Sequence, residues 1–509
     1  MAKKQYSVVV IGGGASGMTA AIAALEEAKA QNAGKLSGTF GVMAEVLLLE
    51  SNDRIGKKIL ATGNGKCNFT HSNISAEHYD TDDIAALEKI LSKYPTKAIL
   101  DFFEKLGMLS REKNGYFYPL SETASTALDV LRLRLSELGC EISCGVYIEK
   151  IEKTGQGFSL QWKEQEKSYR AYADSVILAT GSKAGGFLQN REEDPLRLAK
   201  SLGLSSTKLY PSLVKCICRE DFYYGQLAGV RAQAELTLFC EKEGLYGKQK
   251  GDNNTCRDVS EGMTGHTGKY WKFLRREAGE LQLTKEGISG IAVFQLSGEI
   301  AQKLSEKKRV VVEINFLPGF SEETLKQWAI RRLALLPGRN LEDFFLGVLH
   351  KKVLNVCLLA EGLKGSLRIP SGYTDGNLAE NMERQKESHN RGVQCSDEKR
   401  ALMMVLSVMK RAMHFTTEVT AVSDMKQAQV CRGGLILSQF DKRLECKDLP
   451  GFFACGEVLN VNGECGGYNL HFAWSSGHLA GRAAMRRALR IGASHPIPDG
   501  KGRRSLPRL

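Results

Sequence analysis

The hydrophobic pattern opens with two apolar runs separated by a helical segment. Residues 6–11 and 45–49 are dominated by valine, isoleucine and leucine and hardly alternate with polar residues, which is typical of strands buried on both faces of a sheet. Between them, Ser16 to Ala30 is rich in alanine and predicts a helix. The polar stretch 31–44 then predicts an insertion after that helix. Together these segments predict a βαβ unit of an α/β domain.

Apolar runs further along the chain predict more strands. In the first half they lie at 142–148, 158–162 and 174–179. The pattern changes after that, and 230–240 and 309–316 predict strands of a separate β-rich domain.

The segments around these later strands are polar or helical. The interval 242–283 is polar and rich in turn residues, which predicts a surface insertion. Residues 321–360 and 399–412 repeat apolar positions at helical spacing, and the polar stretch 368–400 between them predicts a mobile loop. A helix is predicted again near the end, at 470–490.

No internal repeat is visible, so the simplest arrangement is a nucleotide-binding domain that both ends of the chain build around inserted material. The two parts of the predicted nucleotide-binding domain are 1–208 and 431–509, and the second part includes a tail. Between them, a β-rich insert is predicted at 209–317 and a helical insert at 318–412. Residues 413–430 are expected to complete the β-rich insert.

The loop after the first strand carries a dinucleotide-binding fingerprint, because residues 12–17 fit G-x-G-x-x-G between a strand and a helix. Gly12 permits the tight turn, Gly14 lets the backbone approach a pyrophosphate, and Gly17 lets the helix pack on the strand. Glu50 ends the second strand, where a carboxylate accepts the ribose hydroxyls. It lies further from the fingerprint than the usual ~20 residues, and the insertion at 31–44 accounts for this. A glycine-rich turn in a purely structural βαβ unit stays open at this point.

Two later motifs extend the nucleotide site. Residues 176–181 form an apolar run that ends in Ala-Thr-Gly, and residues 452–457 form another that ends in Gly-Glu. In FAD enzymes of this architecture the Gly-acid pair holds the ribityl chain or its phosphate. The N-terminus of the following helix faces the flavin, where its dipole favours the anionic reduced form. Three motifs in this order favour FAD over NAD as the tightly bound nucleotide.

Two long blocks carry a family resemblance. Residues 55–70 strongly resemble the G-[KR]-K-[IL]-x-x-[ST]-G-x-G-[RK]-C-N-x-T block of a bacterial flavoprotein family, and residues 451–477 are similar to its C-terminal signature. Residues 287–290 and 295–297 look like its middle motif. That family contains the 3-dehydro-bile-acid Δ4,6-reductase and the ribosomal-RNA dihydrouridine synthases. The family usually has Thr where this chain has Cys431, which bears on specificity and not on the flavin.

The resemblance implies the fold and the cofactor. The expected fold class is α/β, a two-dinucleotide-type FAD-binding Rossmann domain with an inserted β-barrel-like domain and a helical domain. By analogy with the family, NADH or NADPH is expected as a transient electron donor. No second complete G-x-G-x-x-G is visible that would identify this donor. The residues expected to bind FAD are Gly12, Gly14, Ala15, Ser16, Gly17, Glu50, Lys58, Gly63, Cys67, Asn68, Ala179, Thr180, Gly181, Gly456, Glu457, Gly467, Tyr468, Asn469 and Leu470.

The resemblance also implies one reaction type, in which hydride passes from reduced flavin N5 to the β-carbon of a C=C conjugated to a carbonyl. Such a reaction needs a donor near the carbonyl oxygen and an acid for the α-carbon. Lys66, Asn68 and Tyr468 are the catalytic candidates, because their loops are expected to flank the flavin ring. The alternative role for each is loop hydrogen bonding or a phosphate contact.

Other reactive side chains have a plainer interpretation. Cys67 lacks a spaced partner cysteine, so packing is favoured over redox cycling. His471 and His478 lie two helical turns apart and share a face, and without further metal-ligand spacing a packed helix face is favoured over a metal site. No metal is therefore expected.

Several functions remain open. The first is an ene-reductase acting on a small molecule, a 3-oxo bile acid or steroid that is free or CoA-conjugated. The second is a dihydrouridine synthase whose partner is ribosomal RNA. A non-catalytic flavoprotein or RNA-binding scaffold and a flavin-dependent amine or aminoketone oxidase are further alternatives.

Composition and charge refine this picture. The 13 cysteines include no CxxC pair, and no run approaches the ~20 apolar residues of a membrane span, so a cytoplasmic protein without membrane insertion is expected. Eleven of the 52 glycines lie in loops that are expected to surround the nucleotide. Residues 482–509 hold eight basic side chains and one acid, so they account for +7 of the net charge of +12. A basic helix and tail therefore explain most of the charge, which weakens the argument for RNA.

Overall fold

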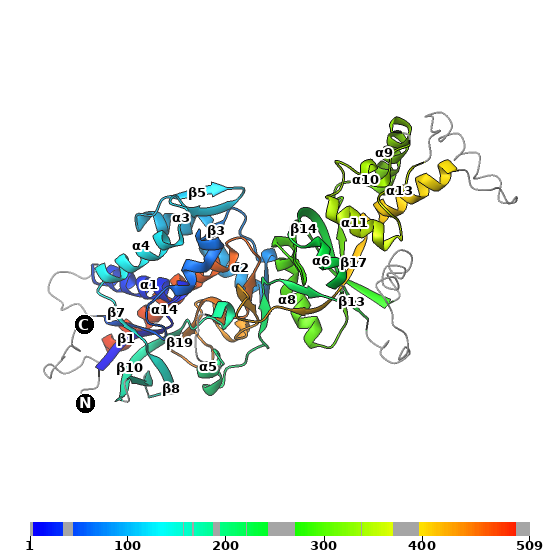
Figure 1. Cartoon of the computed structure of the whole chain (residues 1–509). Helices are drawn as coiled ribbons and strands as arrows, with labels where there is room; N and C mark the ends of the chain where they lie inside the picture. Colours follow the sequence, from blue (N-terminus) through cyan, green and yellow to red (C-terminus); the bar gives the residue numbers. More distant parts are fainter. Residues whose placement is uncertain are drawn as a thin grey trace. The chain divides into compact units, whose positions relative to one another are not determined.

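The computed structural model describes residues 4–33, 44–155, 157–164, 167–186, 194–219, 221–242, 270–336, 338–369 and 397–494. The chain divides into two compact units (Figure 1). Unit 1 combines Met1–Ser212 with Asp424–Leu509, and unit 2 is Leu213–Ser423. The predicted nucleotide-binding domain, built from both chain ends around an insert, stays a prediction. The finer boundary between a β-rich and a helical insert stays a prediction.

Unit 1 is built on a seven-stranded sheet of order β7-β2-β1-β10-β9-β8, with β19 paired to β10. Strands β7, β2, β1, β10 and β19 run parallel, and β9 and β8 add an antiparallel edge. The sheet strands are β1 (Lys4–Ile11), β2 (Val46–Glu50), β7 (Glu141–Cys144), β8 (Tyr147–Lys153), β9 (Phe158–Glu164), β10 (Lys167–Leu178) and β19 (Phe452–Ala454).

Helices pack on this sheet, and short strands surround its loops. The central pair consists of α1 (Ala15–Ala33) and α14 (Tyr468–Ser494), which lie side by side (Figure 1). The remaining elements are η1 (Lys57–Gly65), β3 (Thr70–His71), η2 (Ala76–His78), β4 (Tyr79–Thr81), α2 (Ile84–Lys93), α3 (Thr96–Lys105), β5 (Ser110–Lys113), β6 (Tyr116–Pro119), α4 (Ala124–Glu137), η3 (Ala184–Gly186), α5 (Arg197–Ser201), β11 (Tyr210–Ser212), β18 (Val430–Arg432), η4 (Leu437–Gln439), η5 (Gly456–Val458) and β20 (Val461–Gly463).

Unit 2 is a closed barrel of order β12-β15-β14-β13-β16-β17 with helices packed on it. One apolar core runs through barrel strands and helices alike, from Leu236 in the barrel to Leu333 and Val405 in the helices. Its elements are β12 (Cys216–Cys218), α6 (Asp221–Leu227), β13 (Arg231–Glu241), β14 (Trp271–Leu283), β15 (Gly287–Ser289), α8 (Ile291–Ser305), β16 (Val310–Asn315), α9 (Glu322–Leu335), α10 (Leu341–Phe344), α11 (Lys351–Ala360), α13 (Asp397–Met413) and β17 (Phe415–Val422).

Two predicted segments are wrong. The interval 242–283 is not wholly a surface insertion, because its end is strand β14, which pairs along β13 from Arg231↔Gln282 to Glu241↔Trp271. Its many charged residues hid the strand, since only one of its faces is buried. The single strand predicted at 142–148 is two strands, because Gly145 takes a positive φ of 73° between them. Much of the predicted insertion at 31–44 and of the predicted loop at 368–400 lies outside the described residues.

No helix of the described residues is both long and apolar enough to cross a membrane.

A buried carboxylate in the barrel gives a first testable prediction. Glu418 is 5% exposed and accepts from the Arg309 guanidinium at 3.0 and 3.1 Å, with Arg219 Nη1 2.7 Å from Oε2. We expect Arg309→Met to lower the free energy of unfolding by about 2 kcal/mol, because it leaves a buried charge with one partner. Urea unfolding measures this loss.

The matched control is Arg276→Met, since Arg276 makes a 3.7 Å ion pair with Glu235 and is 58% exposed. Exposed pairs are worth little, so we expect a loss of roughly 0.5 kcal/mol or less. Equal losses for the two variants would show that burial of Glu418 does not matter.

Candidate functional site

The turn between β1 and α1 has room for a backbone ligand but not for side chains. Gly12 has a φ of +111°, and a Cβ on it would lie 2.2 Å from Ala179 O. A Cβ on Gly17 would lie 1.8 Å from Gly12 O. A Cβ on Gly14, in contrast, would meet nothing within 4 Å. Gly12 and Gly17 are therefore required by packing, whereas Gly14 leaves open space at the start of α1.

Glu50 closes this turn from the end of β2. It is 7% exposed, and its Oε2 accepts from Gly13 N at 2.7 Å. Its Oε1 accepts from the backbone and side-chain nitrogens of Asn52, both at 2.7 Å. These bonds hold the carboxylate beside the glycine turn, and its contact with a ribose stays a prediction.

The second and third motifs meet the first from distant parts of the chain. A Cβ on Gly456 would lie 2.3 Å from Ser16 Oγ, so the Gly-Glu turn packs directly on the start of α1. Glu457 accepts from Lys58 Nζ at 2.7 Å and from Cys431 N at 3.0 Å. A Cβ on Gly181 would lie 3.7 Å from Glu457 Oε2, which places the Ala-Thr-Gly turn there too. Thr180 uses its hydroxyl locally, donating to Pro195 O at 3.3 Å.

The segment from Gly56 to Asn68 is an irregular loop. Gly63, Gly65 and even the non-glycine residues Asn64 and Cys67 take positive φ. Cys67 is fully buried, and burial raises the pKa of its thiol to about 11, so the thiol stays protonated. These features fit a packed cysteine and offer no redox role.

The three catalytic candidates do not share one environment. Lys66 is 54% exposed and pairs with Glu122 at 3.0 Å on the surface. Asn68 lies against the start of α14, where a Cβ on Gly467 would lie 2.8 Å from Asn68 Oδ1. Tyr468 follows directly and is 4% exposed. The structure thus brings Asn68 and Tyr468 together and turns Lys66 toward Glu122.

The last two predicted cofactor residues have structural partners. Asn469 Oδ1 accepts from Gly463 N at 2.9 Å, and its Nδ2 donates to Gly463 O at 2.7 Å. Leu470 is partly buried against the core of unit 1. Asn469 therefore holds the turn that precedes α14, whereas Leu470 packs on the core.

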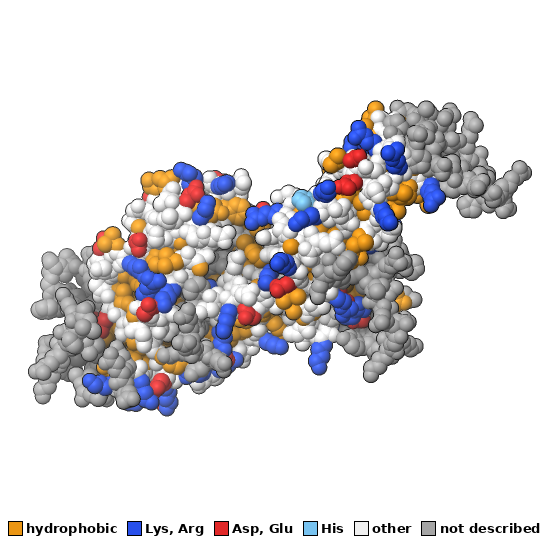
Figure 2. Space-filling model, in the orientation of Figure 1, with side chains coloured by type: hydrophobic (Ala, Val, Ile, Leu, Met, Phe, Trp, Pro, Cys, Tyr) orange, Lys and Arg blue, Asp and Glu red, His pale blue; other side chains and the backbone are white. Residues whose placement is uncertain are grey.

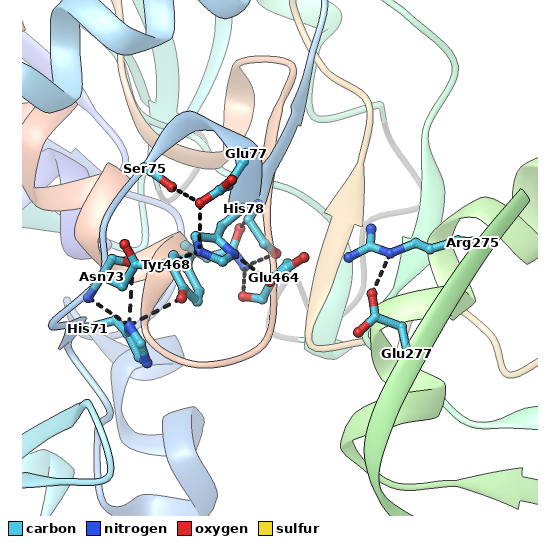
Figure 3. Close-up of polar contacts among 11 residues, drawn as sticks. His71, Asn73, Ser75, Glu77, His78, Arg275, Glu277, Glu464 and Tyr468 are labelled. Atoms are coloured by element: carbon cyan, nitrogen blue, oxygen red, sulfur yellow. Dashed lines mark hydrogen bonds and ion pairs between the residues drawn. The ribbon is translucent and has the colours of Figure 1, made fainter. Parts of the chain in front are cut away.

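Two histidines that no sequence motif indicated surround Tyr468 (Figure 3). The His71 ring stacks on the Tyr468 ring with centroids 5.0 Å apart, and the His78 ring lies 4.7 Å away. Tyr468 OH and His71 Nδ1 are 3.2 Å apart, and His78 Nδ1 lies 2.9 Å from Glu464 Oε2. We call His71, His78, Glu464 and Tyr468 the histidine–tyrosine cluster.

The two histidines of α14 are part of the core. His471 Nδ1 lies 2.8 Å from Thr70 Oγ1, and its Nε2 lies 2.9 Å from Tyr94 O. Burial lowers the pKa of His471 to about 4 and that of His478 to about 3, so both are neutral at physiological pH. No group of three or more potential metal ligands occurs among the described residues.

These observations fit a bound FAD. The space at Gly14 lies at the N-terminus of α1, where a helix favours a pyrophosphate. Near the start of α14, Asn68 Oδ1 is buried and meets no hydrogen-bond partner among the described residues. A buried acceptor without a donor is rare and indicates a missing ligand group.

Comparison with known proteins shows the family of the chain. The model of the HI0933-like protein Rossmann domain matches residues 6–483. The chain belongs to the HI0933-like family. This confirms the predicted resemblance and fold class, and supports FAD as the cofactor.

Named relatives cover nearly the whole chain. The chain is 32% identical over 479 residues to the 3-dehydro-bile acid delta(4,6)-reductase of Clostridium scindens, covering 94% of this chain and 98% of that protein. It is 23% identical over 491 residues to the ribosomal RNA dihydrouridine synthase of Haemophilus influenzae, covering 95% and 100%. A solved structure, the 3-ketosteroid-delta4-(5alpha)-dehydrogenase of Rhodococcus jostii, aligns over 95% of this chain and 97% of its own at 13% identity and a TM-score of 0.41.

Proposed function

We propose that this HI0933-like protein is an FAD-dependent reductase of a C=C bond conjugated to a carbonyl. The favoured substrate is a 3-oxo-4,6-diene bile acid or related steroid, free or CoA-conjugated, with NADH or NADPH as electron donor. The observation that carries the proposal is the 32% identity to the bile acid reductase over 98% of that relative's length. Bound FAD supplies hydride to the substrate in this chemistry.

The chain's own residues have distinct roles in this proposal. The Gly12–Gly14 turn and Glu50 bind the nucleotide end of FAD. Lys58 and Glu457 form an ion pair at 2.7 Å, which places one positive and one negative group beside the Gly-Glu turn. Asn68 offers a buried acceptor to a donor of the cofactor. Tyr468 supplies the proton that the α-carbon needs, because burial raises the pKa of its phenol and keeps the hydroxyl protonated.

An anaerobic assay tests the proposed reaction. The purified protein, loaded with FAD, is incubated with NADH or NADPH and a 3-oxo-4,6-diene steroid. We expect the absorbance of the conjugated diene to fall, because hydride addition shortens the conjugated system. A saturated 3-oxo steroid is the control and should not change. No loss of diene absorbance with either donor would overturn the proposal.

A dihydrouridine synthase of ribosomal RNA is the second candidate. It is favoured by the relatives with that name, at 23% identity, and by the net charge of +12. Among the described residues on the face in Figure 2, basic side chains are scattered with acidic ones between them. Mapping dihydrouridine in ribosomal RNA from a deletion strain tests this function, and an unchanged map would exclude it.

The remaining alternatives are tested with the same protein. Rapid release of peroxide in air would favour an amine or aminoketone oxidase. Reduction of bound FAD by NADH at ordinary turnover rates would exclude a purely structural role for the flavin.

A further inference from the structure

The hydrogen bonds of His71 define which partner carries the proton. Asn73 N donates to His71 Nδ1 at 3.0 Å, so Nδ1 is unprotonated in this arrangement. Tyr468 OH lies 3.2 Å from the same nitrogen and must therefore be the donor. The phenolic proton of Tyr468 therefore points at His71 in this arrangement.

Hydrogen-bond acceptors are also available for His71 Nδ1 when the imidazole is protonated. The carbonyl oxygen of Asn73 lies 3.3 Å from His71 Nδ1 and becomes an acceptor once that nitrogen carries a proton. The hydroxyl oxygen of Tyr468, 3.2 Å from Nδ1, is a second acceptor for that proton. A partner for Nδ1 thus exists in both protonation states, which is what a residue that takes up and releases a proton requires.

Charged and titratable groups from several elements face His71. They are Tyr116 on β6, Glu112 on β5, His78 on η2, Glu464 from the loop before α14, and Tyr468 on α14. Partial burial lowers the pKa of His71 below its usual 6.5, a second histidine adds to this, and the two glutamates oppose it. His71 is consequently neutral at pH 7 and protonates in mildly acidic solution.

We propose that His71 is a positioning and relay residue that turns Tyr468 into the acid of the reduction. This inference rests on the proposed function. Hydride adds to the β-carbon, the Tyr468 hydroxyl gives its proton to the α-carbon, and protonated His71 returns its Nδ1 proton to the tyrosinate oxygen. Two electrons and two hydrogens are added to the C=C bond, and water restores the proton of His71. The observed bond, from Tyr468 OH to unprotonated Nδ1, is the state after this transfer.

A first experiment needs no substrate. Histidine labelled with ¹⁵N is titrated by NMR in the holoenzyme, with His71 assigned by its loss in His71→Gln. We expect the Nε2–H tautomer at pH 7.5 and a transition below pH 6.5. In Tyr468→Phe the transition should move to lower pH, because the imidazolium loses a charge-assisted acceptor. A His71 titration that is identical in wild type and Tyr468→Phe would overturn the relay.

A second experiment follows the reaction with substrate. FAD is first reduced anaerobically, and stopped-flow mixing with a 3-oxo-4-ene steroid measures its reoxidation. We expect the wild-type rate to fall as pH rises through the His71 transition, because only protonated His71 can restore Tyr468 directly. His71→Gln should be about tenfold slower below pH 6 and independent of pH, and Tyr468→Phe roughly 100-fold slower. Flavin reduction by NADH is measured separately in each variant, so that a slower reduction of FAD is not taken for slower transfer to the steroid.

His414→Gln in unit 2 is the matched histidine control and should keep the wild-type profile. If the wild-type flavin is not reoxidised by any such steroid, the proposed function fails while the NMR titration still tests the pair. If wild type turns over and His71→Gln keeps its pH dependence, the function stands and the relay is wrong.

Discussion

Gly14→Ala should give a protein that folds but binds FAD roughly 100-fold more weakly, a loss of about 2.7 kcal/mol. A Cβ at this position would meet no atom of the chain within 4 Å, so the fold does not exclude it. The proposed pyrophosphate needs that space, because backbone N–H groups bind it only at close approach. The flavin content after purification, and fluorescence titration of the apoprotein with FAD, measure the effect.

Two further glycine variants make this result specific. Gly17→Ala places a Cβ 1.8 Å from Gly12 O, so it should lower thermal stability as well as FAD binding. Gly155→Ala, with nothing within 4 Å of its Cβ, should change neither property. If Gly14→Ala retains a full complement of FAD, the nucleotide does not lie over this turn.

Gly481→Ala should destabilise unit 1 strongly, by about 3 kcal/mol. Helices α1 and α14 pack so closely that a Cβ on Gly481 would lie 2.2 Å from Ala20 O, and one on Gly477 would lie 2.5 Å from Ser16 O. Both obstacles are backbone atoms of α1, which cannot turn aside as a flexible side chain does. Relief therefore requires the two helices to move apart, and the core between them loosens. Urea unfolding of the apoprotein measures the loss without the contribution of FAD.

The control uses the same change in another helix. Gly225→Ala in α6 meets nothing within 4 Å, so the helix propensity of alanine should make it neutral or more stable by up to about 1 kcal/mol. A gain of similar size for Gly481→Ala would show that the close approach of α1 and α14 is not essential.

The sequence predicted the strands of the nucleotide domain better than its helices. Strands such as β1 and β2 were recognised because they are continuous apolar runs, and the structure places them within one or two residues of the predicted ranges. The helices α2, α3 and α4, which lie between η1 and β7, were not predicted. Their buried positions recur at helical spacing, as Leu87, Ile90 and Leu91 do in α2, so the pattern that indicates these helices is present in the sequence.

Some residues of the candidate site were predicted from motifs, and others were found only in the structure. The motifs predicted the glycine turn and the Gly-Glu pair, and the structure places Ser16 against Gly456. No motif indicated His71, which pairs with Tyr468 across 397 positions of the chain. Lys66, in contrast, belongs to a motif, and yet its side chain pairs with Glu122 on the surface. A motif identifies a loop, but it does not determine where each side chain of that loop points.

The sequence by itself determined the nucleotide-binding architecture, because a glycine fingerprint and buried parallel strands depend on local requirements of turn geometry and hydrophobicity. Only the tertiary structure decided the surroundings of Tyr468. Its ring contacts with His71 and His78, and its hydrogen bond with His71, arise when β3, η2 and α14 fold together. Such contacts join residues that have no periodic relation in the chain, so no local pattern can reveal them.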